Sequence, residues 1–322
     1  MHPDRALALR SFGPTELQVT PICIGTAALG NMPETFDYSV PEDQALLTLQ
    51  AFFAGPLNFL DTAASYGDGE SERRIGLALG ALGGLPAGMV LSTKADRDLS
   101  TGDFSGDQMR RSVERSLRLL GLDSLQIVFL HDPEHTSFAS AMAAGGPVQT
   151  LLSLQQQGLI EHIGVAGGPI GMEIQYVETG LFSAVITHNR YTLLNRSAAP
   201  LLDVAHARGM AVLNAAPYGS GILAKGPDTY ARYAYQDASS VMIDRTRSLQ
   251  AICGRHGVPL AAAALQFSLR DPRITSTIVG VTRPERIAQT LALAAHPISS
   301  DVWSDLAEVP FEAEDPERDR WR

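Results

Sequence analysis

The sequence predicts a (β/α)8 TIM barrel, because eight short apolar runs alternate with longer amphipathic segments along most of its 322 residues. Near-continuous apolar strands separated by helices are typical of a parallel sheet covered by helices. Eight such units in roughly 260 residues match the strand number and length of a closed barrel. The alternative is a doubly wound open sheet, whose first strand would lead into a G-x-G-x-x-G turn. The chain has GTAALGN at that point, so the barrel is favoured.

The chain opens with a predicted β-hairpin at about residues 5–21, with its turn at Gly13 and Pro14. We expect this hairpin to close the floor of the barrel. The strands that follow are short runs rich in apolar and β-branched residues, bounded by turn-forming residues. They are expected at residues 22–30, 57–64, 89–95, 125–132, 160–167, 184–191, 210–218 and 275–281.

Apolar residues recur at helical spacing between these strands, for example in residues 106–120 and 259–269. The Gly-rich stretch 141–150 indicates a break between helices within one unit, so we expect one domain over residues 1–322. The charged end of the chain, residues 311–322, is expected to be a mobile tail.

The composition excludes several classes of protein. Apolar residues make up 45% of the chain and charged residues 19%, which is typical of a globular protein. The formal net charge of −10 argues against a nucleic-acid partner, and no apolar run reaches the roughly 18 to 20 residues of a membrane span. Because the first residues lack the features of a secretory signal, we expect a cytoplasmic protein. Cys23 and Cys253 lack the spacing of a metal site or disulfide framework, so we expect them to pack inertly.

Ionisable residues lie at or near the ends of three neighbouring predicted strands. Asp61 ends the second strand and precedes Tyr66 by five residues, Lys94 is one of only two lysines, and His131 closes the fourth strand. Taken singly, each has an ordinary structural explanation as a turn, surface or packing residue. Because a barrel gathers the C-terminal ends of its strands at one face, together they predict a catalytic site.

A cluster of this kind can move a proton. A free tyrosine exchanges protons poorly at neutral pH, since its pKa is near 10. We expect the ammonium group of Lys94 to lower the pKa of Tyr66, and Asp61 to keep Lys94 charged. His131 is expected to hydrogen-bond the substrate oxygen. The set suits proton transfer coupled to hydride transfer at a carbonyl or alcohol carbon.

The stretch NFLDTAASYGDGESE at residues 58–72, with Lys94 and His131, resembles the aldo-keto reductase superfamily. The opening LRSFGPTELQVTPICIGTAALG and the later GSGILAKG also resemble that family. The resemblance implies a (β/α)8 barrel that binds a nicotinamide dinucleotide without a Rossmann fold. The residues that it implies as a catalytic tetrad are Asp61, Tyr66, Lys94 and His131.

The resemblance also implies a set of cofactor contacts along the chain. They are Gly25, Thr26, Asp61, His188, Asn189, Gly219, Ser220, Gly221, Leu223, Gly280, Thr282, Arg283 and Arg286. Two places depart from the family pattern. Ala166 and Gly167 stand where a Ser-Asn pair holds the nicotinamide amide in many members, and Ala215 stands where a stacking tyrosine is common.

Arg283 and Arg286 bear on the choice between NAD and NADP. A guanidinium can pair with the 2′-phosphate of NADP, but the lysine-serine pair typical of NADPH-preferring members is absent. We therefore expect NAD or NADP, with NAD slightly favoured, and no resident metal.

The stretches HDPEH at residues 131–135 and THNRYTLLNRSAAPLL at residues 187–202 resemble the aldose 1-dehydrogenase and pyridoxal 4-dehydrogenase branch of the family. That resemblance implies oxidation of an aldose at C1 to a lactone. The alternatives are a pyridoxal 4-dehydrogenase or a general aldehyde reductase. Substrate contacts are expected from residues 31–40, 131–138 and 230–236. The protein is expected to be a monomer or a small homo-oligomer.

Two rival functions come from other classes. A metal-dependent hydrolase could use His131, Asp132 and His135, but Pro133 disfavours the helix that would align the two histidines. A non-catalytic, cofactor-binding regulatory subunit is the second, and the complete tetrad argues against it.

Overall fold

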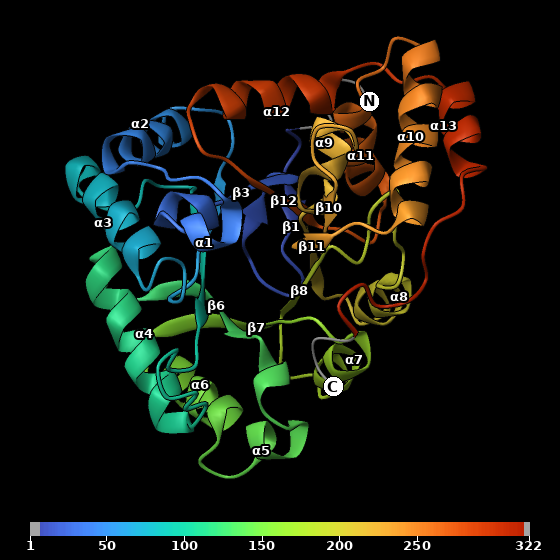
Figure 1. The fold of residues 1–322 in the computed structure, drawn as a ribbon. Coiled ribbons are helices and arrows are strands. Elements are labelled where there is room, and N and C mark those ends of the chain that lie inside the picture. The colour runs from blue at the N-terminus through green and yellow to red at the C-terminus, as the bar shows by residue number, and fades with distance from the viewer. Residues whose placement is uncertain (1–6, 319–322) are drawn as a thin grey trace.

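Eight parallel strands close into a barrel in the computed structural model, which describes residues 7–318 (Figure 1). The strands follow one another in chain order around the barrel, and the last pairs with the first. They are β3 (Ile22–Gly25), β4 (Phe59–Asp61), β5 (Val90–Ala95), β6 (Leu125–His131), β7 (Ile160–Ala166), β8 (Ala184–His188), β9 (Ala211–Ala215) and β12 (Ser276–Gly280). The predicted fold class is confirmed.

Helices surround the barrel on its outer face (Figure 1). The main ones are α2 (Glu42–Phe53), α3 (Glu70–Leu82), α4 (Gly106–Leu120), α6 (Pro147–Gln156), α7 (Ile170–Glu178), α8 (Ala199–Ala207), α11 (Leu260–Arg270) and α12 (Glu285–Ala295). Further out lie α10 (Ser240–Arg255) and α13 (Ser300–Ala307), and short helices α1 (Pro33–Phe36), α5 (Phe138–Met142) and α9 (Ile222–Lys225) occupy the connecting segments. Along the described chain, no helix is long and apolar enough to span a membrane.

The alternation of side chains along each strand produces two separate apolar layers. On β6, Ile127 and Phe129 belong to the cluster that fills the barrel, whereas Val128 and Leu130 belong to the cluster between the sheet and the helices. Successive side chains of a strand point to opposite faces. Because both faces of these strands are buried, their sequences are apolar throughout rather than alternating between apolar and polar residues.

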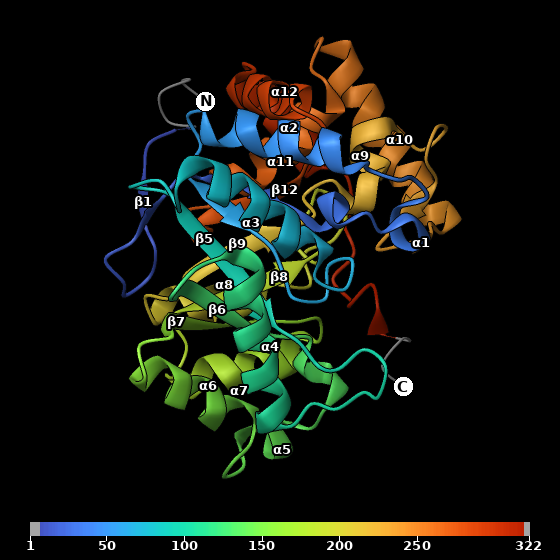
Figure 2. The same cartoon turned by 90° about the vertical axis from the view of Figure 1, so that its left-hand side faces the viewer.

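The N-terminal hairpin closes one end of the barrel. Its strands are β1 (Arg10–Ser11) and β2 (Gln18–Val19). Phe12 and Val19 are fully buried in the cluster that fills the barrel, and the Phe12 ring meets the edge of Phe59 at 5.7 Å between centroids. In Figure 2, β1 lies at one end of the barrel and α1 at the other. The expected hairpin is confirmed.

A second hairpin, which the sequence analysis treated only as loop, follows β9. It consists of β10 (Arg232–Tyr233) and β11 (Gln236–Asp237). Its two turn residues, Ala234 and Tyr235, have φ values of 48° and 64°, the backbone of a tight turn that matches the twist of paired strands. The hairpin places a tyrosine at its tip.

The expectation of a mobile tail is wrong for residues 312–318. Glu312 forms a bridge with Asn195, whose Nδ2 donates to the Glu314 carbonyl oxygen at 2.8 Å. Glu317 is only 2% exposed. The physical reason is Arg190, which is fully buried and lies between the carboxylates of Asp315 and Glu317. Residues 319–322 of the expected tail lie outside the described residues.

Candidate active site

Asp61, Lys94 and Tyr66 meet at the C-terminal mouth of the barrel. β4 pairs with β5, and the Lys94 Nζ donates to Asp61 Oδ2 at 2.6 Å, to the Thr62 carbonyl oxygen at 2.7 Å and to Tyr66 Oη at 3.2 Å. Three acceptors match the three protons of an ammonium group. The geometry therefore fits a charged lysine.

Both partners of this ion pair are buried. Asp61 and Lys94 are each 2% exposed, and Ser92 Oγ donates to the second oxygen of Asp61 at 2.7 Å. Burial alone would lower the pKa of Lys94, but the charge of Asp61 outweighs it, and the pKa of Lys94 is raised. A buried pair with all its hydrogen bonds satisfied holds its charge.

The pKa of Tyr66 differs from the expectation. Burial raises it, Lys94 lowers it and the Asp61 carboxylate raises it, and the net result is a pKa above the ordinary value of tyrosine. Lys94 thus acts in the expected direction, but the expected net lowering is wrong because loss of water around the phenol has the larger effect. Tyr66 is a phenol in this environment.

His131 joins the cluster from β6. Its Nδ1 lies 2.6 Å from Asp96 Oδ1, and its ring meets the Tyr66 ring edge to face at 6.0 Å between centroids. Burial would lower the pKa of His131, but the carboxylates of Asp132 and Asp96 outweigh it, and the pKa is raised. The structure therefore brings all four residues of the expected tetrad together.

Asp96 is a site residue that the sequence analysis missed. It is 4% exposed, and its second oxygen accepts the backbone N–H of Ser65 at 2.8 Å. The signal was present, since Asp96 lies two residues after Lys94 and residues two apart in a strand share a face.

Two expected cofactor residues, His188 and Asn189, lie at the end of β8. The His188 side chain is 26% exposed, and its Nε2 lies 3.2 Å from Glu317 Oε2. Asn189 is fully buried, and its Oδ1 accepts Ser220 Oγ at 3.1 Å. Its Nδ2 completes no hydrogen bond within the described chain. A buried donor without a partner is unusual and calls for an explanation.

Tyr235, at the tip of the second hairpin, lies beside the side chains of Asn189 and Ser220. Burial raises the pKa of its phenol, and the approach of the Asn189 and Ser220 side chains lowers it in part. Tyr235 is also close enough to Tyr66 to raise the pKa of that phenol. Residues 230–236 were expected to contact the substrate, but nothing in the sequence indicates that Tyr235 contacts two expected cofactor residues.

The segment after β9 is a loop with unusual backbone geometry. Gly219, Ser220 and Gly221 have φ values of 58°, 61° and 129°, which glycine adopts more easily than other residues. Leu223 does not reach the mouth, because it is fully buried in a separate apolar cluster and its N–H donates to the Tyr218 carbonyl oxygen.

The remaining expected cofactor residues divide into two groups. Gly25 and Thr26 are buried at the end of β3, and the Thr26 hydroxyl donates to the Asp61 carbonyl oxygen at 2.9 Å. These two residues shape the strand end. Gly280 is exposed at the end of β12, and Thr282 accepts a hydrogen bond from Gln44 through its carbonyl oxygen at 2.6 Å.

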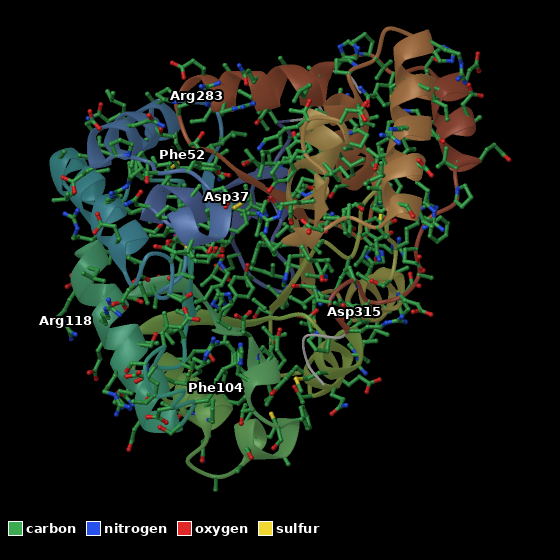
Figure 3. The ribbon with its side chains drawn as sticks, viewed as in Figure 1. Asp37, Phe52, Phe104, Arg118, Arg283 and Asp315 are labelled. Atoms are coloured by element: carbon green, nitrogen blue, oxygen red, sulfur yellow. The ribbon has the colours of Figure 1, made fainter. Side chains whose placement is uncertain are left out.

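Arg283 and Arg286 lie at the start of α12, next to Gly280 and Thr282. Arg283, labelled in Figure 3, has a side chain 52% exposed and lies 3.9 Å from Glu285. Arg286 donates to Gln289 Oε1 at 3.2 Å. Both guanidinium groups are accessible to an anionic ligand.

The departure from the family pattern after β7 has a steric cause. A Cβ on Gly167 would lie 2.8 Å from Glu134 Oε2, and one on Gly168 would lie 2.8 Å from Glu134 Oε1 and 2.9 Å from Arg190 Nη2. The Glu134 carboxyl group thus fills the space of the missing side chains. Burial, aided by the charge of Asp132, raises the pKa of Glu134 to about 7.

No group of three or more His, Cys, Asp or Glu side chains within residues 7–318 is arranged to hold a metal ion. The triad considered for a hydrolase, His131, Asp132 and His135, is therefore not assembled as a metal centre. Both cysteines are buried and free.

The chain is similar to known proteins over most of its length. A family model described as the aldo/keto reductase family matches residues 21–310. D-threo-aldose 1-dehydrogenase of a Pseudomonas species is 30% identical, over 91% of this chain and 94% of its own. Pyridoxal 4-dehydrogenase of Microbacterium luteolum is 29% identical, over 94% of this chain and 97% of its own.

Among solved structures, an aldo-keto reductase of Bacillus halodurans in its holo form has a TM-score of 0.77 to this chain. The match covers 97% of this chain and 99% of the other at 20% identity. That structural likeness supports the assignment of the (β/α)8 barrel fold.

Proposed function

Because the chain belongs to the aldo/keto reductase family, we propose that it is an NAD(P)-dependent oxidoreductase that transfers a hydride between a nicotinamide cofactor and a carbonyl or alcohol carbon. The observation that carries the proposal is the Tyr66 hydroxyl, 3.2 Å from the charged Nζ of Lys94 and beside the ring of His131. A positioned phenol of this kind can exchange a proton with a substrate oxygen while hydride moves at the adjoining carbon.

The residues present fit a nicotinamide dinucleotide. The unpartnered Asn189 Nδ2 is a donor for the oxygen of the nicotinamide amide. The loop at residues 219–221 has a left-handed backbone that lets it approach a pyrophosphate closely, although the N–H groups of Gly219 and Gly221 already donate to the carbonyl oxygens of Ala216 and Tyr218. Arg283 and Arg286 can contact the adenosine end. When bound, the cofactor would accept or donate the hydride, and we propose NAD as the favoured form.

Each member of the tetrad has a role in this proposal. Tyr66 Oη exchanges the proton with the substrate oxygen, and Lys94 with Asp61 stabilises the negative charge that develops on Tyr66 Oη. His131 hydrogen-bonds the substrate oxygen and orients the reacting carbon. The burial of Asp61 and Lys94 excludes water from the charged pair, which strengthens its effect on Tyr66.

We propose that the substrate is an aldose, oxidised at C1 to a lactone. The similarity to D-threo-aldose 1-dehydrogenase supports this assignment, and the similarity to pyridoxal 4-dehydrogenase keeps pyridoxal as the alternative. The mouth of the barrel is bordered by polar segments suited to a hydroxylated ligand, since Asp37 after α1 forms an ion pair with Arg232 of the second hairpin at 2.6 Å.

The test is a panel of aldoses, pyridoxal and simple aldehydes with NAD or NADP in both redox states, followed by the absorbance of the reduced nicotinamide. We expect turnover of at least one aldose with NAD. Turnover of pyridoxal alone would favour the alternative, and cofactor binding without turnover of any compound would favour a regulatory subunit.

We propose further that residues 1–322 form one domain and act as a monomer or small homo-oligomer in the cytoplasm. The single barrel with its hairpin and docked C-terminal segment supports one domain. Limited proteolysis that released a stable fragment shorter than the barrel would contradict it.

A further inference from the structure

We propose that the carboxylate of Glu134 selects the oxidised form of the cofactor, because it places a negative charge beside the nicotinamide ring, which is positively charged in NAD⁺ and neutral in NADH. This role rests on the proposed function, since it requires a nicotinamide at the mouth of the barrel. Glu134 lies outside the tetrad and outside the expected cofactor contacts.

Glu134 lies against the end of β7, beside the tetrad residue His131. His131 pairs with the last residue of β7, and the next two residues, Gly167 and Gly168, have no side chains. The two carboxyl oxygens of Glu134 lie 2.8 Å from the places that Cβ atoms on these glycines would take. Burial raises the pKa of Glu134, and the charges of His188 and His131 act in the opposite direction, so both imidazoles lie near its carboxyl group.

The proposed reaction brings the nicotinamide ring to this part of the mouth. The substrate oxygen contacts Tyr66 and His131, and the ring that exchanges the hydride must touch the adjoining carbon. His188 ends β8 two residues after Ile186, whose side chain fills the barrel, so it points to the same interior face. Because β7 lies between β6 and β8, a carboxyl group on the end of β7 borders the space that the ring enters.

The positive charge of Arg190 does not cancel the charge of Glu134. Arg190 Nη2 also approaches Gly168, at 2.9 Å from the place of a Cβ. However, Nη2 lies 2.8 Å from Asp315 Oδ1, and Nη1 lies 3.0 Å from Glu317 Oε2. Three carboxyl groups thus surround one guanidinium, and Glu134 Oε2 is buried without a hydrogen-bond partner in the described part of the chain. A cation bound beside Glu134 would stabilise its charge.

Glu134 changes its charge near neutral pH. Burial, aided by the charge of Asp132, raises its pKa to about 7. On α7, burial also raises the pKa of Glu173 and of Tyr176, which favours their uncharged forms. Glu134 is therefore a carboxylate above about pH 7 and an uncharged acid below it. The titratable and charged groups that face it are His131, Asp132, Glu173, Tyr176, His188 and Arg190.

The ionised and uncharged forms of Glu134 act differently on the two forms of the cofactor. The carboxylate stabilises bound NAD⁺ and has little effect on the uncharged ring of NADH, so the preference for NAD⁺ grows as the pH rises. The coupling is reciprocal: binding of NAD⁺ lowers the pKa of Glu134. NAD⁺ binding near pH 7 therefore releases a proton.

Equilibrium binding of NAD⁺ and NADH to Glu134→Gln tests this role, because glutamine keeps the shape of the side chain and does not ionise. At about pH 8.5 we expect the variant to bind NAD⁺ about tenfold more weakly than wild type, and NADH within about twofold. At about pH 5.5 the two proteins should bind NAD⁺ within about twofold of each other. Calorimetry near pH 7 in buffers of different ionisation enthalpy should show less proton release with NAD⁺ in the variant.

Glu178→Gln is the matched control. It makes the same substitution at the exposed end of α7, so both Kd values should remain at the wild-type level. Glu134→Asp keeps a carboxyl group that can ionise and should retain most of the preference for NAD⁺.

Equal Kd values for NAD⁺ in Glu134→Gln and wild type at about pH 8.5, or an equal loss for NAD⁺ and NADH, would overturn the role of Glu134 and leave the proposed function intact. If Glu134→Gln does not fold, calorimetry of the wild type decides, because absence of proton release with NAD⁺ near pH 7 would also overturn it. Failure of the wild type to bind either form would instead refute the proposed function.

Discussion

Lys94 Nζ lies 2.6 Å from Asp61 Oδ2 in the mouth of the barrel, and each residue is 2% exposed. The pair joins two neighbouring strands and places a positive charge beside the hydroxyl of Tyr66. The pair explains why the apolar strand β4 ends in the carboxylate of Asp61. Asp61 is the partner that allows a lysine to remain charged inside the protein.

The first prediction concerns that pair. Asp61→Asn removes the carboxylate and leaves the buried charge of Lys94 without its partner, so we expect a loss of about 3–5 kcal/mol in the free energy of unfolding. Urea denaturation measures it. Asp123→Asn, at an exposed position before β6, is the control and should change stability by less than about 0.5 kcal/mol. Equal stability of Asp61→Asn and wild type would show that Lys94 is neutral.

A second prediction concerns Glu72, which is fully buried on α3 and accepts the Thr93 hydroxyl at 2.6 Å. Burial raises the pKa of Glu72 from 4.5 to about 7, so the native state holds a proton that the unfolded state releases near pH 4.5. Stability due to this group is therefore greatest below pH 4.5 and falls as the pH rises to about 7.

Glu72→Gln removes this titration. We expect the variant to exceed wild type by about 3 kcal/mol in unfolding free energy at pH 8, and the difference to shrink steadily toward acid pH. Chemical denaturation across that pH range measures the effect. A difference that did not vary with pH would contradict the assignment of a protonated Glu72.

The third prediction concerns the C-terminal segment. Glu317 accepts from Nη1 of the buried Arg190 at 3.0 Å, and Asp315, labelled in Figure 3, accepts from its Nε at 3.1 Å. Glu317→Gln weakens a hydrogen bond to a charged group, so we expect a loss of about 1.5–3 kcal/mol of stability. Because Glu317 also contacts His188, cofactor affinity should fall as well.

Glu314→Gln is a matched control in the same segment. Glu314 pairs with Arg318 on the surface, where both side chains are more than half exposed. Exposed pairs contribute little, so stability and cofactor affinity should remain at the wild-type level. An equal effect of the two substitutions would show that the segment is not held through Arg190.

The fold could be predicted from the sequence because periodicity and strand count are local signals. The clustering of Asp61, Tyr66, Lys94 and His131 could be predicted because three of them end or interrupt apolar strands, whereas their catalytic role stays a prediction. The docking of residues 312–318 could not, because it depends on Arg190, more than a hundred residues earlier, and a charged end has the composition of a solvated tail. The pKa of Tyr66 was predicted in the wrong direction because the sequence does not show how completely the phenol is buried.

Asp96 and Tyr235 illustrate the two kinds of missed site residue. Asp96 directly follows β5, two residues after Lys94, so continuing the alternation of side chains past the strand end could have found it. Tyr235 lies at the tip of a hairpin whose position over Asn189 and Ser220 is set by tertiary packing, and no local pattern indicates that contact.

The fourth prediction concerns the choice of cofactor. Arg286 is exposed near the start of α12, where a guanidinium can pair with a 2′-phosphate. We expect wild type to favour NAD, and Arg286→Gln to lower kcat/KM for NADP about tenfold more than for NAD. Steady-state kinetics with both cofactors measure this. Equal losses for the two would place Arg286 away from the 2′ position.

The fifth prediction tests the central claim, that Tyr66 exchanges the proton with the substrate. The decisive measurement is kcat for oxidation by Tyr66→Phe, beside the Kd of the same variant for NADH. Phenylalanine keeps the ring and removes only the hydroxyl that contacts Lys94. We expect kcat to fall by about 100-fold or more while the Kd for NADH stays within threefold of wild type. A kcat near the wild-type value would contradict the account.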